Sequence, residues 1–158
     1  MKIRIDDLQS PAIHALLNEH LQNMYELSPP ESVHALNLEK LREPDITFWA
    51  AWENDSLLGC GALKELDPTH GELKSMHTAE AARRQGVGRA MVDHLLALAA
   101  ARGYQRVSLE TGTMAYFAPA RALYADVGFI VCEPFGEYTT NPHSVCMSLT
   151  LPPTARSI

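Results

Sequence analysis

The most informative stretch of the sequence reads Ala82-Arg83-Arg84-Gln85-Gly86-Val87-Gly88-Arg89-Ala90. It joins residues 71–78, where side chains alternate as in a β-strand, to residues 86–102, where apolar side chains recur at helical spacing. Glycine at the start of a helix lets the backbone approach a ligand closely. Because the first turn of a helix carries unpaired N–H groups and a partial positive charge, this junction predicts an anion site.

Three arginines surround the two glycines, at positions 83, 84 and 89. Their guanidinium groups carry fixed positive charge and planar donors that suit phosphate. The chain as a whole has a formal net charge of −6, so a cluster of positive charge indicates a local function. The alternative is an ordinary glycine-containing helix start with a solvated basic rim.

Two phosphate-binding patterns match the glycines only in part. No Gly-Lys-Ser/Thr occurs, which argues against a Walker loop. A dinucleotide site is a serious competitor, because Gly86-x-Gly88 precedes a helix and Glu110 ends the next strand, where a ribose-binding acid belongs. However, Met91 replaces the third glycine, and a polar loop separates the strand from the glycines. A dinucleotide-binding oxidoreductase is therefore the weaker alternative.

The rest of the chain alternates predicted strands and helices. Hydrophobic periodicity and turn residues predict strands at 2–5, 46–53, 57–66, 71–78, 105–110, 129–132 and 144–151, and helices at 10–26, 31–41, 86–102 and 117–126. Hairpin-like strands followed by strand–helix alternation predict an α/β fold with a mixed sheet. The length of 158 residues predicts a single domain over 1–151, with a flexible tail at 152–158.

Two motifs carry a family resemblance. The loop Arg83-Arg84-Gln85-Gly86-Val87-Gly88 resembles the R/Q-x-x-G-x-G/A pyrophosphate loop of the GNAT (Gcn5-related N-acetyltransferase) superfamily. Leu123-Tyr124-Ala125-Asp126-Val127-Gly128-Phe129 resembles the closing Leu-Tyr-x-x-x-Gly-Phe motif of the same family. The likeness runs over about residues 46–130, and segments 72–76 and 134–138 are similar to a branch of small, single-domain bacterial members. It implies a mostly antiparallel sheet of six or seven strands, flanked by about four helices and splayed between the fourth and fifth strands.

The resemblance also implies an acyl-CoA N-acyltransferase domain with acetyl-CoA as co-substrate. In that family the loop amides bind the diphosphate, and the backbone of the fourth strand meets the pantetheine. Carried onto this sequence, the N–H of Met76 faces the thioester oxygen, where one preorganised donor stabilises the oxyanion of the transition state. The expected cofactor-binding residues are Met76, His77, Thr78, Arg83, Arg84, Gln85, Gly86, Val87, Gly88 and Arg89.

Tyr124 is the first candidate catalytic residue. A phenol is protonated at neutral pH and can donate a proton to a departing thiolate. The tyrosine of the closing motif has this role in similar enzymes. The alternative is an aromatic side chain that packs in the core of a helical layer.

Glu72 is the second candidate catalytic residue, as the base that deprotonates the amine. It resembles a glutamate of the fourth strand that acts through water in histone-acetylating members of the family. Strand alternation predicts Glu72, Lys74 and Met76 on one face. The alternative is a solvent-facing or Lys74-paired carboxylate. Glu110 and His77 are the other candidates for the base, and an ordered chain of water that needs no single base is a further alternative.

The family resemblance places the acceptor between the first helices and the last strands. Glu110, His34 and Tyr138 are the expected substrate-binding residues, and acidic side chains nearby would attract a cationic amine. Solvated loop charges explain the same acids equally well. The predicted activity is direct transfer of acetyl to a primary amine of a small molecule or peptide. The alternative from another class is a non-catalytic acyl-CoA-binding module.

The composition of the chain argues against several other functions. The acidic balance argues against nucleic acid as a partner. The cysteines at 60, 132 and 146 are odd in number and far apart, which disfavours a disulfide framework. No metal-ligand spacing occurs among the seven histidines, and no apolar run is long enough to span a bilayer. We therefore expect a cytoplasmic protein without a metal or membrane partner, and the sequence leaves a homodimer open.

Overall fold

A computed structural model describes residues 1–27, 38–136 and 138–152 of the chain. The elements in this part are β1 (Lys2–Ile5), α1 (Pro11–Leu27), α2 (Leu38–Leu41), β2 (Ile46–Glu53), β3 (Ser56–Asp67), β4 (His70–Thr78), η2 (Glu80–Ala82), α3 (Val87–Ala101), β5 (Arg106–Gly112), η3 (Ala115–Phe117), α4 (Ala118–Val127), β6 (Ile130–Cys132) and β7 (Ser144–Thr150). Every predicted strand is present. Of the helix predicted at 31–41, residues 31–37 lie outside the described residues.

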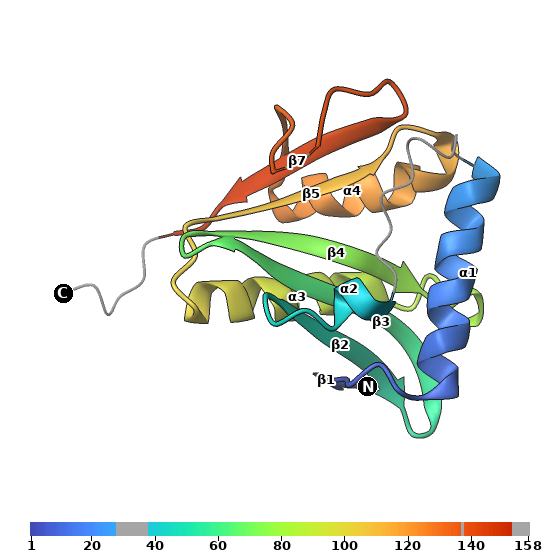
Figure 1. The fold of residues 1–158 in the computed structure, drawn as a ribbon. Helices are drawn as coiled ribbons and strands as arrows, with labels where there is room; N and C mark the ends of the chain where they lie inside the picture. Colours follow the sequence, from blue (N-terminus) through green and yellow to red (C-terminus); the bar gives the residue numbers. More distant parts are fainter. Residues whose placement is uncertain (28–37, 137, 153–158) are drawn as a thin grey trace.

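One mixed sheet runs through the molecule in the order β1-β2-β3-β4-β5-β7-β6. All neighbouring strands are antiparallel except β4 and β5, which run parallel. Helices α1 and α2 cover one face of the sheet, and α3 and α4 cover the other (Figure 1). A mostly antiparallel sheet flanked by four described α-helices confirms the predicted fold. No helix in the described residues is long and apolar enough to cross a membrane.

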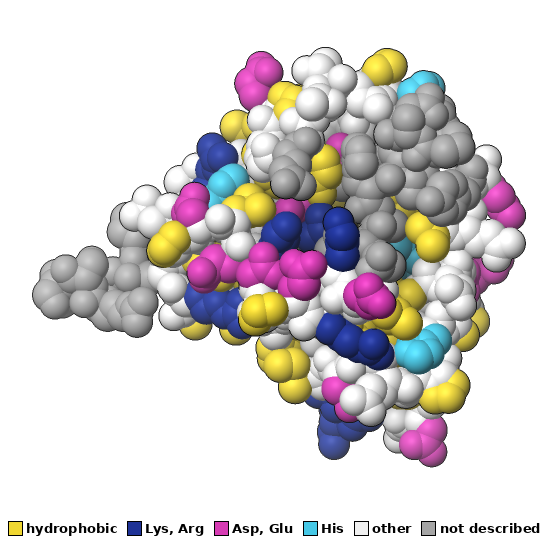
Figure 2. Space-filling view, viewed as in Figure 1, with side chains coloured by type: hydrophobic (Ala, Val, Ile, Leu, Met, Phe, Trp, Pro, Cys, Tyr) yellow, Lys and Arg dark blue, Asp and Glu magenta, His cyan; other side chains and the backbone are white. Residues whose placement is uncertain are grey.

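Each face of the sheet has its own hydrophobic core. On one face, Val92 and Leu95 of α3 are fully buried against the sheet. On the other, Ile13 of α1 and Phe48 of β2 are buried in a second cluster. Burying a side chain of this size stabilises a fold by about 1.5–3 kcal/mol. On the surface drawn in Figure 2, apolar side chains are scattered among polar and charged ones, so the apolar residues are used mainly inside.

Strands β4 and β5 pair over only part of their length. Their register ends at Glu72 and Ser108, although β4 continues to Thr78 and β5 to Gly112. Beyond this point the two strands diverge, which Figure 1 shows as the open angle between them. The splay predicted between the fourth and fifth strands is therefore confirmed. It leaves two strand ends whose facing backbone is available to line a site.

A β-bulge in β4 corrects the predicted alternation. Cys60 pairs with His77 and Ala62 pairs with Lys74, so one residue of β3 faces two residues of β4, Ser75 and Met76. Ser75 has a φ of 53°, which non-glycine residues adopt uncommonly. Because a bulge inserts one extra residue, side chains beyond it change face. Met76 packs against the α3 core, so the prediction that it shares a face with Glu72 and Lys74 is wrong.

Candidate active site

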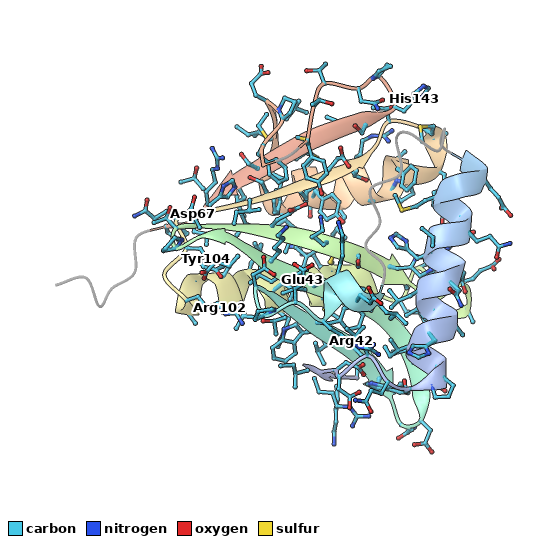
Figure 3. All side chains as sticks on the ribbon, viewed as in Figure 1. Arg42, Glu43, Asp67, Arg102, Tyr104 and His143 are labelled. Atoms are coloured by element: carbon cyan, nitrogen blue, oxygen red, sulfur yellow. The ribbon has the colours of Figure 1, made fainter. Side chains whose placement is uncertain are left out.

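A cavity of about 110 Å³ lies where β4 and β5 diverge. Its walls come from α1, β4, β5, η3, α4 and the segment that leads into β7. The lining residues are His20, Met24, Glu72, Leu73, Lys74, Ser75, Met76, Leu109, Glu110, Thr111, Gly112, Phe117, Ala120, Tyr124, Tyr138, His143 and Ser144. His143 is labelled in Figure 3 on the loop before β7. The cavity thus joins Tyr124, Glu72, Glu110 and Tyr138, which the sequence places in separate segments.

Glu72 belongs to a hydrogen-bonded triangle with Lys74 and Tyr138. The Lys74 ammonium donates to Glu72 Oε2 at 3.0 Å and to the Tyr138 hydroxyl at 2.7 Å. The Tyr138 hydroxyl donates to Glu72 Oε2 at 2.5 Å. The side chains of Lys74 and Glu72 are only 8% and 4% exposed. Of the alternatives for Glu72, the structure therefore shows the carboxylate paired with Lys74.

Tyr138 remains a proton donor in this triangle. Burial, followed by the negative charge of Glu72, raises the pKa of its phenol well above the ordinary value. A protonated hydroxyl can satisfy the carboxylate that lies beside it. A buried charge is tolerated when it is paired and hydrogen-bonded, and the triangle gives Glu72 Oε2 one ion pair and two hydrogen bonds.

Tyr124 lines the deep wall of the cavity from α4. Its side chain is nearly buried, and its ring packs edge-on against Phe129 at 5.8 Å between centroids. Burial raises the pKa of Tyr124 to about 12, so the phenol is protonated at neutral pH. Its environment combines core packing with access to a cavity, and it can both pack and donate a proton.

The charges that line the cavity are net negative. Glu72 and Glu110 provide two carboxylates, and Lys74 provides one ammonium group. His20 adds no charge at neutral pH, because burial and then nearby His77 lower its pKa to about 3. A cationic ligand is therefore favoured over an anionic one in this cavity. His34, the third predicted acceptor residue, lies outside the described residues.

Helix α3 begins at Val87, after Gly86 in the left-handed conformation with a φ of 82°. Its first backbone bond runs from the Ala90 N–H to the Gly86 carbonyl at 3.0 Å. Within the described part of the chain, the N–H groups of residues 85–88 find no backbone or side-chain acceptor. A Cβ added at Gly86 would meet no atom within 4 Å, so the space on that side of Gly86 is open.

Gly88 has a different role from Gly86. A Cβ at this position would lie 3.4 Å from Leu123 of α4 and 3.8 Å from the Thr78 hydroxyl. Both distances are ordinary contacts for a Cβ, so Gly88 lies against α4 and the end of β4, whereas Gly86 faces open space.

The three arginines of the loop are not equivalent. Arg89 forms ion pairs with Asp126 at 2.8 Å and with Asp93 at 3.4 Å, so its charge is largely compensated. Arg83 and Arg84 are exposed and have no carboxylate within ion-pair distance among the described residues. Positive charge toward an anion is therefore provided by the two arginines before the glycines.

Other predicted cofactor residues follow β4 toward this loop. Met76 and Ser75 line the cavity at the bulge. The His77 ring bonds to Glu19 of α1 at 3.1 Å, and His77 is not among the residues that line the cavity. Thr78 pairs with Gly59 of β3 and ends the strand.

Sequence reasoning did not select Tyr116 or Asn23. The Tyr116 hydroxyl accepts hydrogen bonds from Arg83 at 2.9 Å and from Asn23 at 3.1 Å. The adjacent aromatics Tyr116 and Phe117, between β5 and the closing motif, are a signal that could have drawn attention to this segment. Asn23 carries no such signal, since only the fold brings α1 to η3.

Residues 13–129 match the acetyltransferase (GNAT) family, which is most of the chain. The chain belongs to this family. It is 56% identical to the uncharacterized N-acetyltransferase YsnE of Bacillus subtilis, over 96% of this chain and 100% of the relative. It is 51% identical to the uncharacterized N-acetyltransferase YedL of Escherichia coli, over 94% of each. The protein is thus an N-acetyltransferase of the GNAT family, and the predicted kinship with small bacterial members is confirmed.

Solved structures agree with this membership. A Klebsiella pneumoniae protein assigned to the acyl-CoA N-acyltransferases superposes with a TM-score of 0.74 at 25% identity, over 95% of this chain and 97% of that one. A GNAT family acetyltransferase from Elizabethkingia anophelis, solved with acetyl-CoA bound, has a TM-score of 0.68 at 19% identity, over 95% and 97% of the two chains. The second likeness shows the common GNAT fold.

The lowered pKa of His20 makes the stability of the fold depend on pH. Because its pKa is about 3 in the folded protein and 6.5 in the unfolded chain, the unfolded chain alone takes up this proton below pH 6.5. Stability is therefore greatest above that pH and falls as the pH decreases. We expect a loss of about 1–2 kcal/mol between pH 7 and pH 5 from this group.

Urea unfolding of wild type and His20→Gln at pH 7 and pH 5 measures the contribution of His20 to the free energy of unfolding. The variant should lose less stability on acidification than wild type. His143→Gln, which changes another histidine that lines the cavity but has an exposed side chain, is the matched control. Parallel losses in wild type and His20→Gln would contradict the assignment to His20.

Proposed function

We propose that this protein transfers an acetyl group directly from acetyl-CoA to a primary amine of a small molecule or peptide. In this reaction the amine nitrogen forms a bond to the acetyl carbon and the carbon–sulfur bond breaks. The amine loses a proton, and the thiolate of coenzyme A gains one. One observation carries the proposal: the cavity between β4 and β5 contains a protonated tyrosine and two carboxylates, and β4 leads from this cavity through η2 to the unpaired amide donors at the start of α3.

The residues before α3 fit the diphosphate of acetyl-CoA. Open space at Gly86, unpaired N–H groups and the uncompensated charges of Arg83 and Arg84 are what a diphosphate requires. Gln85, Val87 and Gly88 contribute backbone donors to the same site. Arg89 is the weakest member, since Asp126 and Asp93 already neutralise it.

The end of β4 fits the remainder of the cofactor. Met76 and Thr78 offer backbone donors and acceptors along the diverging edge, and His77 contributes through its backbone. The bulge at Ser75 and Met76 leaves an extra residue outside the regular ladder, as bulges do near active sites. We propose that the Met76 N–H is the donor for the thioester oxygen. The bound acetyl-CoA in the Elizabethkingia anophelis relative supports a cofactor of this kind.

We assign Tyr124 the role of general acid. Its phenol is protonated at neutral pH and lines the cavity, so it can donate to a thiolate that departs there. Its ring packs edge-on against Phe129, which holds the side chain against the core. General acid catalysis contributes about 100-fold or more to the rate of such reactions.

We assign the acceptor side to Glu72, Glu110 and Tyr138. The net negative lining attracts an amine in its cationic form. Glu72 is the proposed proton acceptor, acting through water at Oε1, because its described hydrogen bonds from Lys74 and Tyr138 are both made to Oε2 and hold the carboxylate in place. Glu110, on the facing strand, is the proposed partner of the ammonium group before its proton leaves.

Family membership argues against the two rival functions. The dinucleotide alternative needs Glu110 at a ribose, whereas Glu110 lines the same cavity as Tyr124. A non-catalytic binding module does not require a protonated tyrosine and two carboxylates in one cavity. A screen of amines that measures release of free coenzyme A tests the proposal, and no release with any amine would favour the binding module.

Gly86→Leu tests the diphosphate site. The side chain would enter the open space before the amide donors, and the positive φ would strain the loop. We expect affinity for acetyl-CoA, measured by calorimetry, to fall by about tenfold or more, which corresponds to about 1.4 kcal/mol. Gly103→Leu is the matched control, since Gly103 has a φ of 85° just beyond the other end of α3. Equal binding in the two variants would mean that the site is elsewhere.

Tyr124→Phe tests the general acid. With the amine that the screen identifies, we expect kcat to fall about 100-fold, because the proton donor is lost. The calorimetric Kd for coenzyme A should change by less than about twofold, since the ring still packs. Tyr104→Phe, at the end of the sheet away from His143 in Figure 3, is the control. Full activity in Tyr124→Phe would remove the proposed role.

Glu72→Gln and Glu110→Gln separate the base from the binding carboxylate. We expect Glu72→Gln to lower kcat by about 100-fold and to change the pH dependence of the rate. Glu110→Gln should mainly raise KM for the amine, because it removes attraction but no proton acceptor. The pH–rate profiles of the two variants are the measurement. A loss of kcat in Glu110→Gln with only a raised KM in Glu72→Gln would reverse the two assignments.

A further inference from the structure

Tyr116 connects the two arms of the splayed sheet, of which one consists of β1–β4 and the other of β5–β7. It lies in η3, the short turn between β5 and α4. Its hydroxyl accepts hydrogen bonds from Arg83 Nη2 at 2.9 Å and from Asn23 Nδ2 at 3.1 Å. Arg83 precedes α3 on the β4 arm, and Asn23 lies on α1. Three segments that are far apart in sequence therefore meet at one oxygen atom, beside the cleft.

The contact orients Arg83 without neutralising it. A tyrosine hydroxyl is uncharged, and no carboxylate of the described residues pairs with Arg83. The guanidinium lies 5.6 Å from the centroid of the Tyr116 ring, which adds an attraction between cation and aromatic face. Arginine has five N–H donors, and Tyr116 takes one in the described structure, so the others can receive an anion.

These contacts contribute little to folding. The Tyr116 side chain is 38% exposed, and both of its hydrogen bonds lie at the surface. Exposed interactions of this kind have small effects on stability. The two contacts instead restrict the rotamers of the Arg83 side chain before an anion binds. Binding then costs less conformational entropy at this side chain.

We propose that Tyr116, itself held by Asn23, is a positioning residue that preorganises Arg83 for the diphosphate of acetyl-CoA. The inference rests on the proposed function, in which Arg83 binds that diphosphate. It adds η3 to the cofactor site, on the arm opposite the phosphate loop. Tyr116 acts through Arg83 and need not touch the cofactor.

Binding of coenzyme A to Tyr116→Phe tests the proposal without an acceptor amine. The variant keeps the ring but removes the oxygen that holds Arg83. We expect the calorimetric Kd for coenzyme A to rise about fivefold, because the variant loses the one hydrogen bond that orients the Arg83 guanidinium. The midpoint of urea unfolding in the absence of ligand should stay unchanged. Tyr104→Phe, which loses a hydroxyl bonded to Glu65 at 2.8 Å away from the cleft, should leave the Kd unchanged.

A double-mutant cycle shows whether Tyr116 acts through Arg83. Arg83→Gln alone should raise the Kd and weaken its dependence on salt. The double variant should bind no more weakly than Arg83→Gln, because the oxygen has nothing left to position. Additive losses would overturn the positioning role.

The outcomes distinguish this inference from the proposed function. An unchanged Kd in Tyr116→Phe, with a raised Kd in Arg83→Gln, overturns the inference and leaves the diphosphate site intact. Tighter binding in Tyr116→Phe overturns it as well, since the contact would then be a barrier across the cleft. Unchanged binding in both Arg83→Gln and Gly86→Leu would contradict the diphosphate site itself.

Discussion

The site depends on the end of pairing between β4 and β5. Their hydrogen-bonded register stops at Glu72 and Ser108, and both strands then continue apart. Unpaired backbone inside a protein is costly unless water, a side chain or a ligand satisfies it. The divergence can persist because the opening is lined by polar groups and because helices on both faces hold the two arms of the sheet.

The buried charged groups in this opening are stabilised by pairing and hydrogen bonding with one another. The carboxylate of Glu72 is satisfied by Lys74 and Tyr138, which are hydrogen-bonded to each other as well. Such a closed network holds its members in one arrangement, whereas an unpaired buried charge would not be tolerated. Glu110 then sets the net sign of the cavity lining, and that sign suits a cationic acceptor.

The loop before α3 carries positive charge, and that charge is compensated at only some of its arginines. Acidic neighbours compensate Arg89, but a neutral hydroxyl holds Arg83. Charge that is oriented and left uncompensated is what an anionic ligand can use. Because η2 and this loop join β4 to α3, the unpaired donors at the start of α3 and the cavity are connected through one strand.

Much of this architecture could be predicted from local signals. The strands and helices follow from periodicity and breakers, and the glycine–arginine loop and the closing motif with Tyr124 point to the GNAT family. The predicted alternation along the fourth strand failed at Ser75, because a bulge is set by packing against β3 and α3 and leaves no mark in the pattern of residues.

The sequence by itself determined the elements, the family and the residue types at the site, since these depend on neighbours along the chain. Only the tertiary structure decided how those residues are paired. It joined Glu72 to Tyr138 across 66 positions, compensated Arg89 while leaving Arg83 uncompensated, and brought Asn23 to Tyr116 across 93. Charge compensation and hydrogen bonding between distant segments depend on where the fold places them, and local patterns carry no information about that.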